Sequence, residues 1–261
     1  MKYFPPVPNL FINGDGYLKG FLGLTWLPSD SAKAKVADYE GTVSSLLFGL
    51  QKRYTSYWIL REIAAASPKR VEVTPPDFAP AEFGENASGG DLDAKTGTRD
   101  GSYIDASKRG TPGKTCLPEK KSDDVPATGR GADNVVAFRA GRWGGLEGPG
   151  SAADEILLHE LVHAARFARG LANPCLPSPR DWGNYEEFLA VTLCNVFSSE
   201  TGRGQRLGHA GFRKLPPAEA TSAGFLAKYN EYLTTFPSDH PHLSAALKRA
   251  PGIPFNPFAL M

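Results

Sequence analysis

Residues 156–166, ILLHELVHAAR, are the stretch of this 261-residue chain on which the fold prediction depends most. Apolar residues surround a His-Glu-x-x-His pattern, which predicts a helix buried around its polar side chains. His159 and His163 are about one helical turn apart, so their imidazoles lie on one face and can bind one tetrahedral zinc ion. Glu160 follows the first histidine and can act as general base toward a water on that ion. Burying three such side chains without a partner costs free energy, so the pattern favours a metal site.

A catalytic zinc site needs a third protein ligand and keeps one position open for water. Residues 184–190, NYEEFLA, place two acids at the start of a later predicted helix, after a loop short enough to fold that helix back against the first. Glu187 and Glu186 are therefore the candidate third ligands, and a slip of one residue turns the side chain by about 100°. Asn184 with Glu187 also fits a capping box, in which the acid only closes the helix start. The spacing alone leaves these alternatives open.

Two other arrangements around His-Glu-x-x-His do not fit this sequence. The metzincin pattern would place a glycine at position 166 and a histidine at position 169, where this chain has Arg166 and Arg169. The deformylase type uses an upstream cysteine in an EGC-like motif, and none of the three cysteines stands in one. We expect both arginines on the helix surface, where they contact solvent, a peptide backbone or an acidic substrate.

The two motifs together carry a family resemblance. HELVHAAR at 159–166 followed by NYEEFLAV at 184–191 resembles the gluzincin-type zincin metallopeptidases among bacterial toxins and effectors, and is similar in detail to NleD-like type III effector peptidases. The specific match covers roughly residues 152–213. The resemblance implies a zinc endopeptidase that acts inside a target cell. It also implies that the third ligand is the acid directly before Phe-x-Ala, which here is Glu187.

The chemistry expected of such a site is hydrolysis of a peptide bond. Zinc would lower the pKa of its bound water and polarise the scissile carbonyl, while Glu160 takes the water proton and delivers it to the leaving amine. The tetrahedral oxyanion usually needs a second donor besides the metal. His209 and Tyr185 are the candidates for this catalytic role, by residue type and by proximity in sequence to the motifs.

Four further residues are weaker candidates. Cys194 lies two turns after Glu187 on the same predicted helix face, although a buried cysteine is commonly just a small hydrophobe. Cys175 lies in the loop between the two motif helices and could be a regulatory thiol. We expect His240 and His242 in a surface turn.

The chain as a whole predicts one α+β domain, a zincin-like fold in which a small twisted sheet packs on the His-Glu-x-x-His helix and the C-terminal half is mostly helical. The single domain is expected to span 1–261, with an N-terminal part (1–133), a catalytic core (134–213) and C-terminal helices with a tail (214–261).

Local patterns predict most of its elements. Residues 1–30 are expected to be extended chain and turns, and Gly49 is the weak point of one long or broken helix over 36–66. The polar stretch 77–133 is expected to be a solvated insertion that could act as a lid or recognise substrate. The other expected elements are strands at 71–74 and 134–138, a helix capped at Ser151 and running to 168, and helices at 185–199, 218–236 and 243–248.

Composition and charge exclude some classes of partner. Lys and Arg number 29 against 28 Asp and Glu, so no strong field favours nucleic acid. No apolar run is long enough to span a membrane, and residues 1–16 lack the apolar core of a secretory signal. We therefore expect synthesis in a cytoplasm without a signal peptide, followed by export through a specialised bacterial secretion system into a target cell.

The function that the sequence predicts is zinc-dependent cleavage of a protein substrate by a secreted bacterial effector or toxin. The alternative is a non-catalytic zinc-binding scaffold that binds a partner protein, although a scaffold has no need for the general base Glu160. A toxin made in a cytoplasm needs a neutralising partner or a target that its producer lacks, so an inhibitor or immunity protein is a second expected partner.

Overall fold

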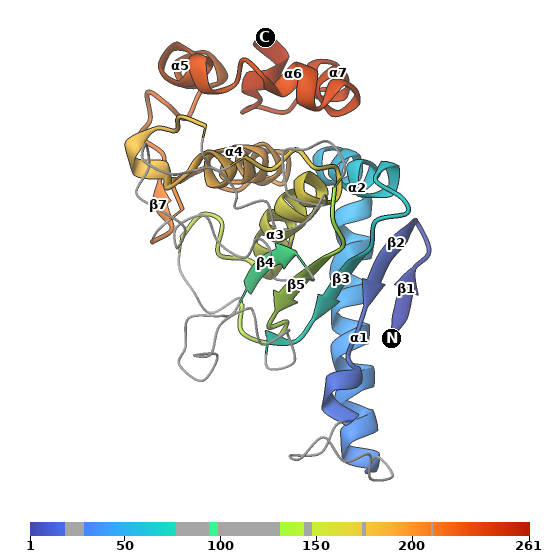
Figure 1. Cartoon of the computed structure of the whole chain (residues 1–261). Helices are drawn as coiled ribbons and strands as arrows, with labels where there is room; N and C mark the ends of the chain where they lie inside the picture. Colours follow the sequence, from blue (N-terminus) through green and yellow to red (C-terminus); the bar gives the residue numbers. More distant parts are fainter. Residues whose placement is uncertain (19–28, 77–93, 99–130, 144–147, 174–175, 210) are drawn as a thin grey trace.

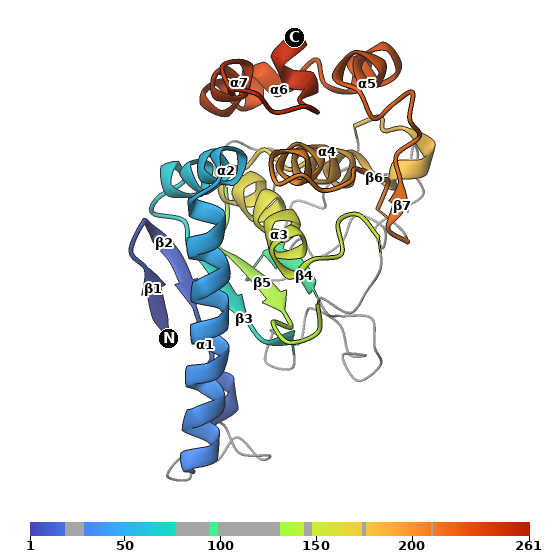
Figure 2. The same cartoon turned by 180° about the vertical axis from the view of Figure 1, so that it is seen from behind.

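The computed structural model is a mixed α+β fold in which helices cover one face and one end of a five-stranded sheet (Figure 1, Figure 2). The structure describes residues 1–18, 29–76, 94–98, 131–143, 148–173, 176–209 and 211–261. Most of the expected insertion at 77–133 and the cysteines Cys116 and Cys175 therefore lie outside the described residues. Among the helices in these ranges, none is both long and apolar enough to cross a membrane.

The sheet has the strand order β1-β2-β3-β5-β4, with parallel pairing of β2, β3 and β5 and antiparallel pairing at both edges. Its strands span Lys2–Phe4 (β1), Val7–Ile12 (β2), Val71–Thr74 (β3), Ala94–Thr98 (β4) and Asn134–Phe138 (β5). Two short strands, Arg206–Leu207 (β6) and Arg213–Lys214 (β7), form a separate antiparallel pair. The predicted strands at 71–74 and 134–138 are confirmed, whereas the sequence analysis missed the others.

The central strands follow from their residue types. β3 and β5 are rich in valine and buried along their whole length, as parallel strands inside a fold are. β2 carries Pro8, which argues against a strand when only the sequence is seen. The parallel ladder of β2 with β3 begins only at Leu10, so the missing N–H of Pro8 removes no bond from it.

The helices form two groups (Figure 1, Figure 2). Helices α1 and α3 lie against one face of the sheet, and α5, α6 and α7 form an outer layer over α4 and α2. Their bounds are Asp30–Gln51 (α1), Tyr54–Ala65 (α2), Ala153–Ala168 (α3), Tyr185–Glu200 (α4), Ser222–Tyr229 (α5), Phe236–Asp239 (α6) and Pro241–Lys248 (α7). The C-terminal half is thus mostly helical, as predicted. The single helix predicted over 218–236 is wrong, because α5 ends at Tyr229 and a 3-10 helix (Asn230–Tyr232) and a turn separate it from α6.

The long or broken helix predicted over 36–66 is broken, and it begins earlier, at Asp30; the break falls at Lys52 and Arg53, just after the predicted weak point Gly49. A distant residue explains this position. The carboxylate of Glu200, at the end of α4, accepts hydrogen bonds from the backbone nitrogens of Tyr54 and Thr55 at 2.6 and 2.9 Å. This carboxylate satisfies the free N–H groups at the start of α2 and so stabilises a new helix start there.

Helix α3, which carries both predicted histidine ligands, is buried along nearly its whole length. It begins one residue later than predicted, at the N-cap Ala152, whose backbone nitrogen donates to the carboxylate of Glu155 (3.2 Å). It ends where predicted: Gly170 has a φ of +68°, and the backbone nitrogen of Leu171 donates to the carbonyl of Arg166 (2.9 Å).

An aromatic cluster fixes the start of α4. The ring of Trp182, in a short 3-10 helix (Arg180–Trp182), lies 5.2 Å from Phe188, 5.8 Å from Phe225 and 5.4 Å from Tyr229, centroid to centroid. All four side chains are buried. Edge-to-face aromatic pairs of this kind add to the free energy of apolar burial. The segment that carries both candidate acids therefore packs against α5.

Candidate metal centre

Two helices bring the three predicted ligands together. On α3, the Nε2 atoms of His159 and His163 lie 3.1 Å apart. From the first turn of α4, Glu187 Oε2 lies 3.0 Å from the first of these nitrogens and 3.5 Å from the second. In a tetrahedral site with Zn–N bonds of about 2.0–2.1 Å, two ligand atoms are about 3.3 Å apart. The three atoms therefore have the spacing of three corners of a zinc tetrahedron.

A third histidine lies at the same carboxylate. His209 Nε2 is 3.4 Å from Glu187 Oε2, and the rings of His209 and His159 are 5.7 Å apart. His159, Glu187 and His209 each offer a ligand atom within 4.8 Å of the others, so this group could hold a metal ion. The side chain of His209 is 56% exposed, whereas those of His159 and His163 are 7% and 9% exposed. His209 therefore stands on the solvent side of the cluster.

The electrostatics of the cluster fit a cation. Glu187 Oε2 is buried and accepts no hydrogen bond from the described residues. Burial would raise the pKa of Glu187, but His163 and His159 outweigh it and hold that pKa well below the usual range. Burial lowers the pKa of His159 to about 3, whereas for His163 burial is outweighed, chiefly by Glu187, and the pKa rises to about 9. At neutral pH the cluster thus keeps a proton on His163, a positive charge that a bound metal cation can replace.

Glu160 lies buried beside this cluster and is bonded to strand β4. The hydroxyl of Thr96 donates to Glu160 Oε2 at 2.7 Å and lies 3.0 Å from the backbone oxygen of the same residue. Burial raises the pKa of Glu160 to about 7, against the opposing effects of His163 and the Thr96 hydroxyl. A carboxylate with a pKa near neutrality is suited to general base catalysis. Thr96 was not predicted, because β4 lies within the stretch that was expected to be an insertion.

The start of α4 separates the two roles predicted for Glu187. Asn184 Oδ1 accepts a hydrogen bond from the backbone nitrogen of Glu187 at 3.1 Å and caps the helix. The cap uses only the backbone of Glu187, so its carboxylate still points to the histidines. Asn184 is thus the N-cap, and the carboxylate of Glu187 lies at the histidines instead of closing the helix start.

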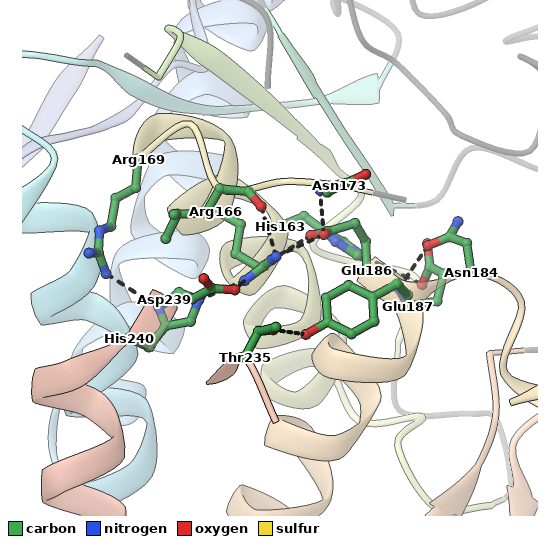
Figure 3. Close-up of polar contacts among 12 residues, drawn as sticks. His163, Arg166, Arg169, Asn173, Asn184, Glu186, Glu187, Thr235, Asp239 and His240 are labelled. Carbon is green, nitrogen blue, oxygen red and sulfur yellow. Dashed lines mark hydrogen bonds and ion pairs between the residues drawn. The ribbon is translucent and has the colours of Figure 1, made fainter. Parts of the chain in front are cut away.

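Glu186, the alternative third ligand, is bonded elsewhere (Figure 3). Its oxygens accept hydrogen bonds from Arg166 Nε at 2.6 Å and Arg166 Nη2 at 2.9 Å, and from the backbone nitrogen of Asn173 at 2.7 Å. Consecutive helix residues point about 100° apart, so Glu187 faces a different direction. The expectation that Arg166 lies on the helix surface is wrong: its side chain is 1% exposed, because Glu186 compensates its charge.

The surface turn expected at His240 is also wrong. His240 is buried, and its Nδ1 lies 2.9 Å from the carboxylate of Glu62 on α2. Arg169 is only partly exposed and pairs with the same carboxylate. Two arginines and an acid, rather than solvent, therefore surround His240. His242 is exposed.

Two other candidates make their hydrogen bonds outside the cluster. The hydroxyl of Tyr185 shares a hydrogen bond of 2.9 Å with Thr235, and the ring of Tyr185 faces Arg166, so the structure does not bring it to the histidines. Cys194 is buried, and its Sγ donates to the backbone oxygen of Glu155 at 3.7 Å. Burial raises the pKa of this thiol far above its ordinary value, which is the behaviour of a small core residue.

The loop that carries His209 is held in place by residues that have no motif. Arg206 donates from Nε to the backbone oxygen of Gly208 (2.9 Å) and from Nη2 to that of His209 (3.0 Å). The backbone of Arg206 exchanges two hydrogen bonds with the side chain of Asn195 on α4. A Cβ at Gly208, whose φ is +68°, would lie 2.1 Å from the backbone oxygen of Asp181, so only glycine fits there. Arg206 and Asn195 were not predicted, because their contacts join segments that no short sequence pattern links.

Comparison of the chain with protein-family models, with curated proteins and with solved structures gave no match. The side chains of this site are therefore the basis for a proposed function.

Proposed function

We propose that the chain is a zinc-dependent metalloendopeptidase of zincin-like fold that hydrolyses a peptide bond in a protein substrate. The observation that supports this most is the convergence of His159, His163 and Glu187 next to the buried carboxylate of Glu160. These three ligands would hold the zinc ion, and two imidazoles with one carboxylate are a ligand set of catalytic zinc sites. Structural zinc sites have four protein ligands. With the exposed His209 assigned to the substrate rather than to the ion, three ligands and an adjacent base favour hydrolysis over a scaffold.

Each residue of the site would have its own role in the proposed hydrolysis. Zinc, when bound, supplies Lewis acidity that makes water more acidic and the scissile carbonyl more electrophilic. Glu160 accepts a proton from the attacking water and passes it to the leaving nitrogen. The C–N bond then breaks, and the products are a carboxylic acid and an amine. We assign His209, on the solvent side of the cluster, to donate a hydrogen bond to the developing oxyanion.

The edge of the sheet supports a peptide as substrate. Within the described residues, β4 pairs with β5 on one side only. Thr96 on this strand contacts Glu160 directly. An extended peptide can add to a free sheet edge through backbone hydrogen bonds. A peptide bound along β4 would therefore pass close to the general base.

The biological setting is a further part of this proposal. We propose that the protein is a secreted bacterial effector or toxin that acts on a protein of a target cell, and that the producing cell holds an inhibitor or immunity partner. This part is supported by the resemblance of residues 152–213 to effector peptidases.

Zinc-dependent cleavage by the purified full chain tests this function. We expect a chelator to stop the cleavage of an unfolded test protein, and one equivalent of zinc to restore it, because the ion completes the site. Mass spectrometry of the fragments should show new termini that correspond to hydrolysis of single peptide bonds. One zinc ion bound per chain, with no cleavage of unfolded proteins or of target-cell extracts, would instead favour the scaffold.

His209→Ala is expected to lower kcat about 10²–10³-fold while zinc content stays unchanged, because it removes a donor to the oxyanion and leaves three ligands. The measurement is steady-state kinetics beside elemental analysis. His242→Ala removes an exposed histidine of α7 and serves as control. Loss of zinc from His209→Ala would show that His209 is a metal ligand, contrary to this assignment.

A further inference from the structure

Arg166 is the centre of a buried polar cluster that extends from the metal-binding side chains to the C-terminal helices (Figure 3). Besides its two bonds to Glu186, its Nη2 donates to the backbone oxygen of Leu171 at 2.9 Å, and its Nη1 lies 2.7 Å from His240 Nε2. All three guanidinium nitrogens are therefore hydrogen-bonded. A planar guanidinium held at every nitrogen has one fixed orientation.

His240 closes the cluster on the side away from the metal ligands (Figure 3). Burial and the two neighbouring cations, Arg166 and Arg169, lower the pKa of His240 well below its ordinary value, so the ring is neutral. A neutral imidazole can accept from Arg166 at Nε2 while its Nδ1–H donates to Glu62 at 2.9 Å. Glu62 on α2 thus holds His240, at the junction of α6 and α7, in contact with the guanidinium of Arg166.

The two acids of α4 differ in how firmly they are held. The side chain of Glu186 is 4% exposed and both of its oxygens accept hydrogen bonds. The side chain of Glu187 is 21% exposed, and its Oε2 accepts no hydrogen bond from the described residues. Its contacts with His159 and His163, at 3.0 and 3.5 Å, can form only where the helix turn that carries it faces them. A rotation of about 100° would exchange the places of the two acids.

We propose that Arg166 is a positioning residue for the metal centre, which acts through Glu186 to direct Glu187 toward His159 and His163. Arg166 lies on the same helix as both histidines, one turn beyond His163, so its grip on Glu186 sets the first turn of α4 directly against the histidine pair. It thereby selects which of two adjacent acids becomes the ligand. This inference rests on the proposed metal centre and is independent of peptide hydrolysis.

Metal affinity of the full chain, measured with Co²⁺ and Zn²⁺, separates this role from a purely structural ion pair. Arg166→Met keeps most of the side-chain volume and removes the guanidinium. Glu186→Gln is the milder change. In the wild type both oxygens of Glu186 accept hydrogen bonds, so either orientation of the glutamine amide places its NH₂ group against an N–H of Arg166 or Asn173. We expect both variants to bind metal about 10–100-fold more weakly, with an altered visible absorption spectrum of bound Co²⁺.

Arg203→Met is the matched control. Arg203 forms a bidentate pair with Asp154 at the other end of α3, with distances of 2.7 and 2.6 Å. We expect it to lower the melting temperature of the metal-free protein but to leave metal affinity and the Co²⁺ spectrum at wild-type values. If Arg166→Met does not fold, Glu186→Gln decides. The role of Arg166 would be overturned if Glu186→Gln kept the wild-type metal affinity and Co²⁺ spectrum, or if Arg203→Met lost as much metal affinity as Arg166→Met. Absence of metal binding in the wild type would instead overturn the metal centre itself.

Discussion

Glu160→Gln is expected to lower kcat/KM for peptide hydrolysis about 10²–10⁴-fold while one zinc ion per chain remains bound. Glutamine has nearly the shape of glutamate, and its amide oxygen can still accept the hydrogen bond from Thr96, so the ligands should stay in place. An amide cannot accept the proton of the attacking water at neutral pH. The loss therefore falls on the proton transfer, and the measurement is cleavage kinetics beside elemental analysis of zinc.

The same substitution at Glu155 is the control for Glu160→Gln. Glu155 is equally buried on α3, but its carboxylate bonds to Ser198 and pairs with Arg203 rather than with the metal cluster. Glu155→Gln should lower stability and leave the activity of the folded protein near the wild-type value. Full activity in Glu160→Gln would remove the general base from the proposal.

The pH dependence of the wild type also reports on Glu160. Because burial raises the pKa of Glu160 to about 7, wild-type activity should rise with pH toward neutrality.

The parts of the site that could be predicted from sequence are those set by helix geometry. His159 and His163 share a face because four residues make about one turn, and this needs no knowledge of the fold. Asn184 caps its helix through a bond to a residue three positions on, which is equally local. Glu187 was implied by the family resemblance, and its place beside the histidines depends on how α4 packs on α3.

The parts that were missed depend on contacts between distant segments. Thr96 reaches Glu160 only because β4 pairs with the far strand β5, and no short pattern encodes that pairing. Arg166 has the appearance of a solvent-facing arginine in the sequence, since its partners Glu186 and His240 lie 20 and 74 positions away. Burial of a charge becomes predictable only when its counter-charge is known to be near.

The same division holds for the sheet. Strands β3 and β5 were predicted because each is a short segment that is rich in valine and is followed by a turn. Strand β2 was not, because Pro8 and Asn9 interrupt its apolar pattern. The structure shows that Asn9 is buried and that its side-chain amide donates to the backbone oxygens of Ile63 and Lys69, both at 2.8 Å. A polar residue that indicates a turn in the sequence thus connects this strand to the end of α2.

Glu187→Ala is expected to have the largest effect on metal binding, weakening zinc affinity by more than about 100-fold, because it removes a direct ligand rather than a residue that supports one. His163→Ala should behave in the same way. The measurement is competition for zinc against a chelator of known affinity, together with zinc content. A metal that binds only the folded state stabilises it by about 4 kcal/mol at a thousand times its Kd. At the same zinc concentration a variant weakened more than about 100-fold gains less than about 1.4 kcal/mol, so added zinc should raise the wild-type melting temperature much more than that of either variant.

Asp181→Asn is the control for Glu187→Ala, because Asp181 is an acid just before α4 whose side chain is 65% exposed. It removes one negative charge near the site without removing a ligand, so zinc affinity should change little. Retention of zinc by Glu187→Ala would contradict the ligand set. Because Glu186 is held by Arg166, the remaining candidate for the third ligand would then be His209, whose Nε2 lies 3.4 Å from Glu187 Oε2. Loss of zinc from His209→Ala in the same assay would establish that exchange of roles.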